Sequence, residues 1–148
     1  MIFKVQLCYN RKVGLGVRAV TNIPKDTKIL FYYGDVWNTK EAKELHISKQ
    51  THIMTIPGTG SSIDGAYDIL FPDTNPNMNK IYDAPCNLMS LTNSSKNYKE
   101  ANCKAIIVND AREYSNGLSL SHTAWLTTTR DIEPYEELIW NYSYKIKE

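Results

Sequence analysis

The sequence predicts one mainly β domain that contains several small sheets and short helices. Many short stretches are rich in β-branched and aromatic residues, and several alternate apolar with polar side chains. Long connections that carry glycine, proline and asparagine separate these stretches. Only residues 39–50 have a convincing helical pattern, so the chain lacks the regular alternation of strands and helices that predicts a parallel sheet. The 148 residues predict a single domain over 1–148.

The first half of the chain alternates short β-forming stretches with turns. Pro24 interrupts the β pattern because proline has no N–H for a strand ladder. Thr39 is the predicted N-cap of the helix, since its hydroxyl can accept a bond from a free N–H group. In chain order we expect a strand (2–7), a glycine-punctuated turn leading into an extended run (10–20), a turn (22–28), a strand (29–36), the helix (39–50) and two short strands (52–56, 62–65).

The second half begins with an irregular stretch, residues 66–86, whose prolines and asparagines predict a functional lid or an insertion. We then expect a short helix (88–95), two strands (104–108, 118–129), a turn (130–137) and a final strand (137–145). That last strand would place four large side chains on one face: Leu138, Trp140, Tyr142 and Tyr144. These rings either fill the core or line a site.

Charge and cysteine content exclude several classes of protein. The net charge of +1 and the absence of long basic runs predict no direct binding of nucleic acid. The N-terminal residues have no long apolar core, so we expect neither a secretion signal nor a membrane span. Cys8, Cys86 and Cys103 lie far apart, which argues against a disulfide framework or a zinc site. We expect free thiols in a reducing, intracellular compartment, either nuclear or cytoplasmic.

Two short motifs are ambiguous when each is taken alone. Gly14-Leu15-Gly16 fits a hairpin turn or a backbone that a ligand approaches closely, and it lacks the third glycine of a dinucleotide site. The polar residues of 91–95 fit the cap of a helix or turn as well as they fit part of a functional site. The three histidines have no metal-ligand spacing, so no metal is expected.

The order of these blocks along the chain resembles a SET-domain protein lysine methyltransferase. The block G-L-G-V-R-A-V-T-N-I-P-K-D-T-K-I-L-F-Y-Y-G-D-V resembles the family's opening, with its GxG, "I-P-K-G-T" and Y-x-G-E-V patterns. S-I-D-G, L-T-N-S-S with A-N-C, and R-D-I-E-P-Y-E-E-L-I-W-N-Y-S-Y resemble the later family motifs. The resemblance runs from about residue 3 to 144 and implies the SET fold of several small sheets, with a C-terminal pseudo-knot.

The chain also departs from the family pattern at five points, the first being about three extra residues between Ser95 and the A-N-C block. Ser94 stands where the family has histidine, Tyr135 replaces the glycine of the terminal turn, and Trp140 precedes the motif tyrosine. No cysteine-rich zinc segment, of the kind that precedes or follows other SET domains, is expected. The variable insert of the family falls at about 66–86.

The resemblance implies transfer of methyl from S-adenosylmethionine to a protein lysine, with S-adenosylhomocysteine as product and no metal. It implies that Tyr142 is catalytic and also contacts the cofactor. The other implied cofactor contacts are Gly14, Leu15, Gly16, Asn93 and Ser94, and the implied walls of the lysine channel are Tyr32, Trp140 and Tyr144. Two alternatives stay open: an inactive SET fold that binds proteins, motivated by Ser94, and an unrelated β domain with an aromatic core.

The substrate is expected to be a basic protein or peptide, a histone tail being one candidate. Asp68, Asp73 and Asp83 of the insert are predicted to favour it through their charge. The bulk of Trp140 predicts a crowded site that stops after one or two methyl groups. Homodimerisation is a further option, as a way for a minimal domain to complete its cofactor or peptide site.

Overall fold

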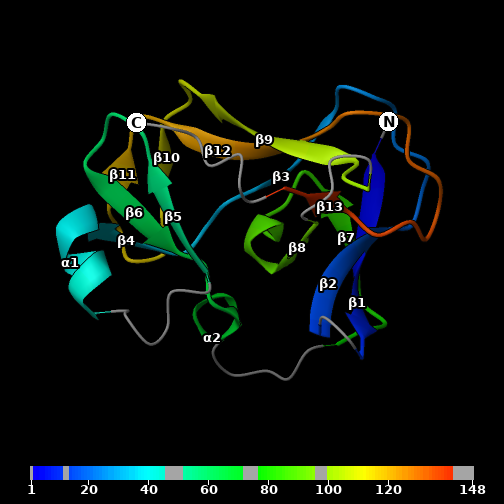
Figure 1. The fold of residues 1–148 in the computed structure, drawn as a ribbon, viewed down its shortest axis with the longest axis horizontal. Helices are drawn as coiled ribbons and strands as arrows, with labels where there is room; N and C mark the ends of the chain where they lie inside the picture. The colour runs from blue at the N-terminus through cyan, green and yellow to red at the C-terminus, as the bar shows by residue number, and fades with distance from the viewer. Residues whose placement is uncertain (1, 12–13, 46–51, 72–76, 96–99, 142–148) are drawn as a thin grey trace.

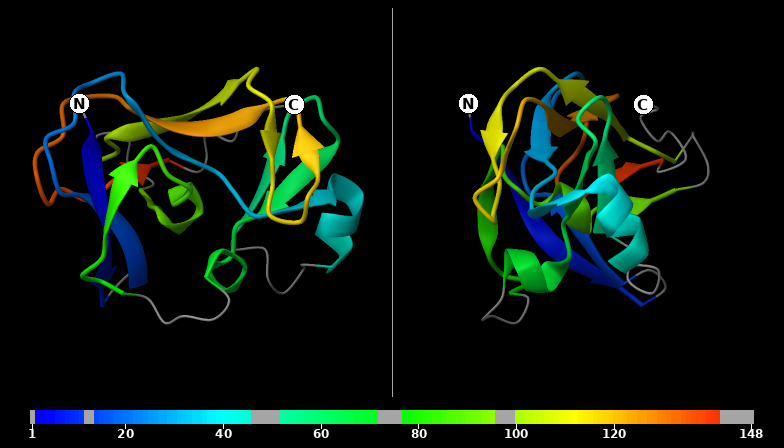
Figure 2. Two further views of the ribbon diagram at one scale, coloured as in Figure 1. Left: turned by 180° about the vertical axis from the view of Figure 1, so that it is seen from behind. Right: turned by 90° about the vertical axis from the view of Figure 1, so that its left-hand side faces the viewer.

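The fold is built from four small sheets, and the computed structural model describes residues 2–11, 14–45, 52–71, 77–95 and 100–141. Two three-stranded sheets lie at opposite ends of the molecule, and a five-stranded sheet spans the distance between them (Figures 1 and 2). This architecture confirms the predicted mainly β class with several small sheets and short helices.

The elements are short, and their bounds follow. The strands are β1 Phe3–Asn10, β2 Gly14–Ala19, β3 Lys28–Phe31, β4 Asp35–Asn38, β5 Ile53–Ile56, β6 Ser61–Asp64, β7 Ile81–Ala84, β8 Asn93–Ser94, β9 Cys103–Val108, β10 Arg112–Glu113, β11 Ser119–Leu120, β12 Thr123–Thr128 and β13 Ile139–Trp140. The helices are α1 Thr39–Leu45, α2 Tyr67–Leu70 and the 3-10 helix η2 Met89–Leu91.

The sheets are ordered β2-β1-β7, β4-β6-β5, β10-β11 and β3-β12-β9-β13-β8. β1 pairs antiparallel with β2 in a register that sets Val5 opposite Ala19 and Leu7 opposite Val17. These four side chains are buried in one hydrophobic core that also receives β3, η2 and β12. Alternation in β1 therefore gives the sheet one core face and one open face, on which Cys8 lies opposite Gly16.

The C-terminal segment inserts between two strands that are close in sequence. Ile139 and Trp140 pair in parallel with Asn93 and Ser94 of β8 on one side, and Trp140 pairs with Cys103 of β9 on the other. β8 and β9 follow one another in sequence, so β13 from near the end of the chain lies between two consecutive strands. This is the predicted pseudo-knot arrangement.

Several sequence predictions need correction. Residues 66–86 are not wholly irregular, because they contain α2 and β7, and β7 pairs with β1 through contacts that local sequence does not reveal. The glycines of 14–16 lie inside β2 and not in a turn. Two predicted strands are each divided, at residues 32–34 and at Ser121-His122. Of the final strand predicted over 137–145, the described part, up to residue 141, is a strand over Ile139–Trp140. The predicted helix 39–50 is confirmed over 39–45, where α1 lies, and residues 46–50 lie outside the described ranges.

Two turn residues adopt a backbone conformation that glycine usually supplies. Asp26 has φ of 63° and Tyr135 has φ of 66°, both in the left-handed region. They stand at the glycine positions of the "I-P-K-G-T" and terminal-turn motifs. Their turns are tied together, since the N–H of Ile23 donates to the carbonyl of Ile132 and the N–H of Ile132 donates in return. The departure at Tyr135 therefore changes the side chain but keeps the turn.

The buried thiols predict a loss of stability in alkali. Burial raises the pKa of Cys86 and of Cys103 to about 12. The folded protein then holds these protons more tightly than the unfolded chain, so unfolding free energy falls as pH rises from about 9 toward 12. We expect each thiol to remove about 2 to 3 kcal/mol by pH 11.

Urea unfolding at pH 8 and pH 11 measures this loss, with Cys103→Ala as the matched variant. The variant is expected to lose less stability over the interval than the wild type, whatever its stability at pH 8. Equal losses in the two proteins would contradict the assigned role of this thiol.

Candidate functional site

Three segments that are far apart in sequence meet at Gly16 of β2. A Cβ added to Gly16 would come within 2.7 Å of both Asn93 Nδ2 and Glu137 Oε2. Such distances are shorter than van der Waals contact, so only glycine leaves room for these two side chains. The amide and the carboxylate thus fill the space over Gly16, whereas nothing lies within 4 Å of a Cβ added to Gly14.

Asn93 and Glu137 are joined directly. Asn93 Nδ2 donates to Glu137 Oε2 over 2.7 Å, and both side chains are half-buried. Burial, followed by the nearby Glu137 carboxylate, raises the pKa of the Cys8 thiol to about 11. Cys8 is opposite Gly16 in the β1–β2 ladder, so the carboxylate lies over the open face of that sheet.

Arg18 is a cation on this face, and its side chain is already engaged. Its Nε and Nη2 donate to Gln6 Oε1 at 3.0 and 2.8 Å. Its guanidinium also lies 5.1 Å from the centre of the Tyr135 ring. In the part of the chain that the structure describes, the Glu137 carboxylate forms no ion pair.

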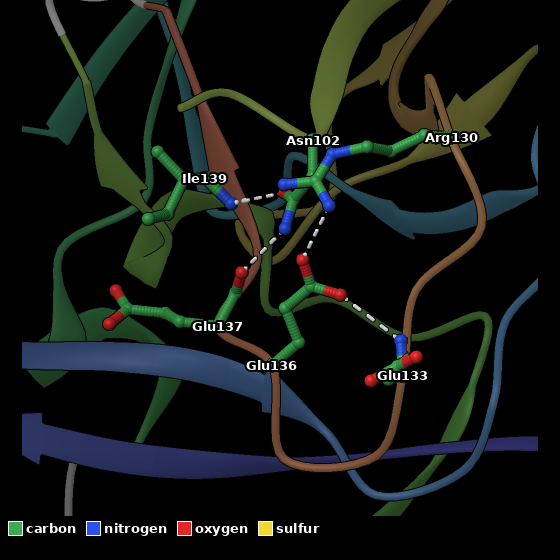
Figure 3. Close-up of polar contacts among 6 residues, drawn as sticks. All are labelled: Asn102, Arg130, Glu133, Glu136, Glu137 and Ile139. Carbon is green, nitrogen blue, oxygen red and sulfur yellow. Dashed lines mark hydrogen bonds and ion pairs between the residues drawn. The ribbon is translucent and has the colours of Figure 1, made fainter. Parts of the chain in front are cut away.

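Asn102 fixes the backbone that carries Glu137 (Figure 3). This residue is only 2% exposed, and its Nδ2 donates to the Glu137 carbonyl over 2.7 Å. Its Oδ1 accepts from the Ile139 N–H over 2.8 Å, and its own N–H donates to the Ile139 carbonyl. A single buried side chain therefore satisfies backbone groups on both sides of Leu138. Sequence reasoning gave no role to Asn102 or to Glu137, although both stand inside quoted motifs.

The predicted channel residues that the structure describes are buried. Tyr32 is 4% exposed and follows β3, while Trp140 is 6% exposed and belongs to β13. Trp140 Nε1 donates to Thr92 Oγ1 over 2.8 Å, which fixes the indole beside the segment that carries Asn93. A Cβ on Gly65 would lie 3.1 Å from Tyr32 Cε1, so this ring packs against the bend after β6. Both rings belong to one hydrophobic core.

The other predicted site residues have different outcomes. Asn93 and Ser94 form β8, which pairs with β13, so the structure brings them together with Trp140. Tyr142 and Tyr144 lie outside the described residues, as does Asp73. Asp83 forms an exposed ion pair with Lys4 at 2.7 Å, and its part in peptide binding stays a prediction. Asp68 is exposed on α2.

The described residues also bear on metal binding and on membrane insertion. No group of three or more histidine, cysteine, aspartate or glutamate side chains there is arranged to hold a metal ion. No helix in these ranges has the length and apolar character needed to cross a membrane.

Comparison with solved structures identifies similar folds. ATXR5 in complex with a mono-methylated histone H3.1 matches with a TM-score of 0.67 and 20% identity, over 97% of this chain and 59% of that one. CpSET8 from Cryptosporidium matches with a TM-score of 0.65 and 19% identity, over the same shares of 97% and 59%. KRYPTONITE in complex with DNA, a histone H3 peptide and SAH gives 0.64 and 19%, over 96% and 24%. This chain therefore spans about three fifths or less of these proteins.

Comparison with curated protein sequences gives no significant match. The model of the SET domain, however, matches residues 14–143, which is most of the chain. That range begins at the first glycine of β2 and includes β8, β9 and β13, the strands that form the knot-like arrangement. This chain belongs to the SET-domain family.

Proposed function

We propose that this chain transfers a methyl group from S-adenosylmethionine to a lysine side chain of a protein. The observation that carries the proposal is the meeting of Gly16, Asn93 and Glu137. Bare backbone lets a nucleoside approach closely, and the two polar side chains suit the amino-acid part of this cofactor. Family membership and similarity in fold to structures solved with histone H3 or SAH support the same chemistry.

The cofactor would supply a methyl group that is already activated on a sulfonium, so the protein has mainly to align the reactants. Gly14, Leu15 and Gly16 present backbone to it, and Asn93 binds its amino-acid part. Ser94 lies next to Asn93 and offers its main chain to the adenine side. A methyl on Gly16 would close this surface, as the distances of 2.7 Å require.

The substrate lysine would enter between aromatic rings. Tyr32 and Trp140, with Tyr144, cover the aliphatic stem of the lysine and exclude water from its amine. Desolvation lowers the pKa of the lysine ammonium and favours the neutral nucleophile. The hydroxyl of Tyr142 orients the methyl group through weak C–H···O contacts.

Transfer of labelled methyl from S-adenosylmethionine to core histones and to a mixed cell extract tests the proposal. Wild type is expected to label protein lysine, and Tyr142→Phe is expected to lose roughly a hundredfold in rate because the methyl is no longer held in line. Tyr82→Phe serves as the matched control, since Tyr82 lies on β7, in another sheet from β8 and β13. Equal loss in both variants would refute the role of Tyr142.

The second candidate is an inactive SET fold that binds proteins, which the serine at position 94 favours. Binding of S-adenosylmethionine, measured by calorimetry, separates the two. A wild type that neither binds the cofactor nor labels protein would overturn the methyltransferase proposal and leave the binding module.

The proposal includes a basic substrate, and a histone tail is the first candidate. It also includes a product that carries one or two methyl groups. Mass spectrometry that finds trimethyllysine would contradict the effect assigned to Trp140. We also propose an intracellular, reducing compartment, because Cys8, Cys86 and Cys103 are free thiols. Homodimerisation stays a prediction.

A further inference from the structure

We propose that Glu137 is a positioning residue that makes this site select ligands carrying an α-ammonium group. It would do so by fixing the orientation of the Asn93 amide and by adding a negative charge beside it. The inference rests on the proposed use of S-adenosylmethionine, and it assigns a role to a residue outside the predicted cofactor contacts.

The hydrogen bond between the two side chains determines which end of the amide is free. A carboxylate only accepts, so Asn93 must turn its NH2 group toward Glu137, as the 2.7 Å contact has it. Asn93 Oδ1 then remains as an acceptor, and none of the described residues donates to it. Without Glu137 the amide could rotate by half a turn and offer a donor instead.

The charge of Glu137 points to a cationic ligand group. Its carboxylate accepts from Asn93 and has no ion pair in the described ranges, while Arg18 is engaged by Gln6. An amide oxygen and a carboxylate side by side, next to backbone that lacks Cβ atoms, form an acceptor pair. Such a pair favours an ammonium group, which carries three donors and a positive charge.

The backbone holds Glu137 in this place from both sides. The Leu138 N–H donates to the Val17 carbonyl over 2.8 Å, and the Ala19 N–H donates to the Glu136 carbonyl over 2.9 Å. Figure 3 shows the Glu137 carboxylate directed away from Asn102, whereas Glu136 turns toward Arg130. The two adjacent glutamates therefore make different contacts. Glu136 accepts hydrogen bonds from Arg130 and from the Glu133 N–H within the turn, and Glu137 faces Gly16 of β2.

Affinity for two ligands tests the inference: S-adenosylhomocysteine, and its analogue with hydrogen in place of the α-amino group. We expect wild type to prefer the amino form. Glu137→Gln keeps an acceptor for Asn93 but removes the charge, so it should bind the amino form about tenfold more weakly and the deaminated form unchanged. Glu137→Ala should lose more, because the amide is also released. Glu136→Gln is the matched control and should change neither affinity.

The ratio of the two affinities separates positioning from structural damage. A damaged fold weakens the binding of both ligands together. A Glu137→Gln variant with an unchanged ratio of affinities would overturn the inference, while the proposed function would stand. A wild type that binds neither nucleoside would overturn both. Binding of the deaminated analogue by each variant shows that the pocket has formed.

Discussion

Asn102→Ala is expected to lose about 3 kcal/mol of unfolding free energy, because the substitution leaves two buried backbone groups without partners. The carbonyl of Glu137 and the N–H of Ile139 both bond to this amide in the folded protein, and Asn102 is almost fully buried. Each lost partner costs about 1 to 3 kcal/mol when water cannot replace it. Chemical denaturation of wild type and variant measures the loss.

Asn102→Asp refines the result, since aspartate can accept from Ile139 but cannot donate to Glu137. We expect it to be destabilised as well, and charge makes the effect pH-dependent. Asn109→Ala is the control, because Asn109 is exposed just after β9. If Asn102→Ala lost no more stability than Asn109→Ala, the terminal segment would not depend on this amide.

Gly34→Ala is expected to have the larger effect of the two, at about 4 kcal/mol or more, and to prevent accumulation of soluble protein. Gly34 has φ of 155°, and a Cβ there would overlap the carbonyl oxygen of Asp64. The atom in the way is backbone of β6, which cannot rotate aside. The expression level of soluble protein and the melting temperature measure the effect.

Gly58→Ala separates backbone strain from steric overlap. Gly58 also has positive φ, at 78°, but nothing lies within 4 Å of an added Cβ. We expect this variant to lose about 1 kcal/mol, the ordinary cost of a left-handed alanine. Similar losses at Gly34 and Gly58 would show that overlap with Asp64 is relieved by small shifts.

Sequence patterns within a single segment predicted the secondary structure of that segment. Alternation predicted β1, a run of β-forming residues predicted β3, and a helical pattern after Thr39 predicted α1. Each pattern lies within one segment, and that segment then packs against a neighbour. The motif resemblance added the order of the segments and so anticipated that β8 and β13 lie together. Leu138 and Trp140 are buried, as the face pattern of the last strand indicated.

The remaining features depend on pairs of residues that no local pattern connects. β7 pairs with β1 across about 75 residues of sequence, and nothing in residues 81–84 alone specifies that partner. No role could be assigned to Glu137 from sequence, because its contact with Asn93 and its position over Gly16 exist only in the folded chain. Gly34 was part of a quoted motif. The need for glycine at this position, however, comes from the backbone of Asp64, which leaves no room for a Cβ.

The insertion of β13 between β8 and β9 also bears on the order in which the strands pair during folding. A two-residue strand gains little by itself and can pair only after both flanking strands are in place. We therefore expect the carboxylate that faces Gly16 to take its place late in folding, with the strand that follows it. Partial unfolding that releases this strand would separate Glu137 from Gly16 and would also expose Leu138 and Trp140, which belong to the same core as β1 and β2.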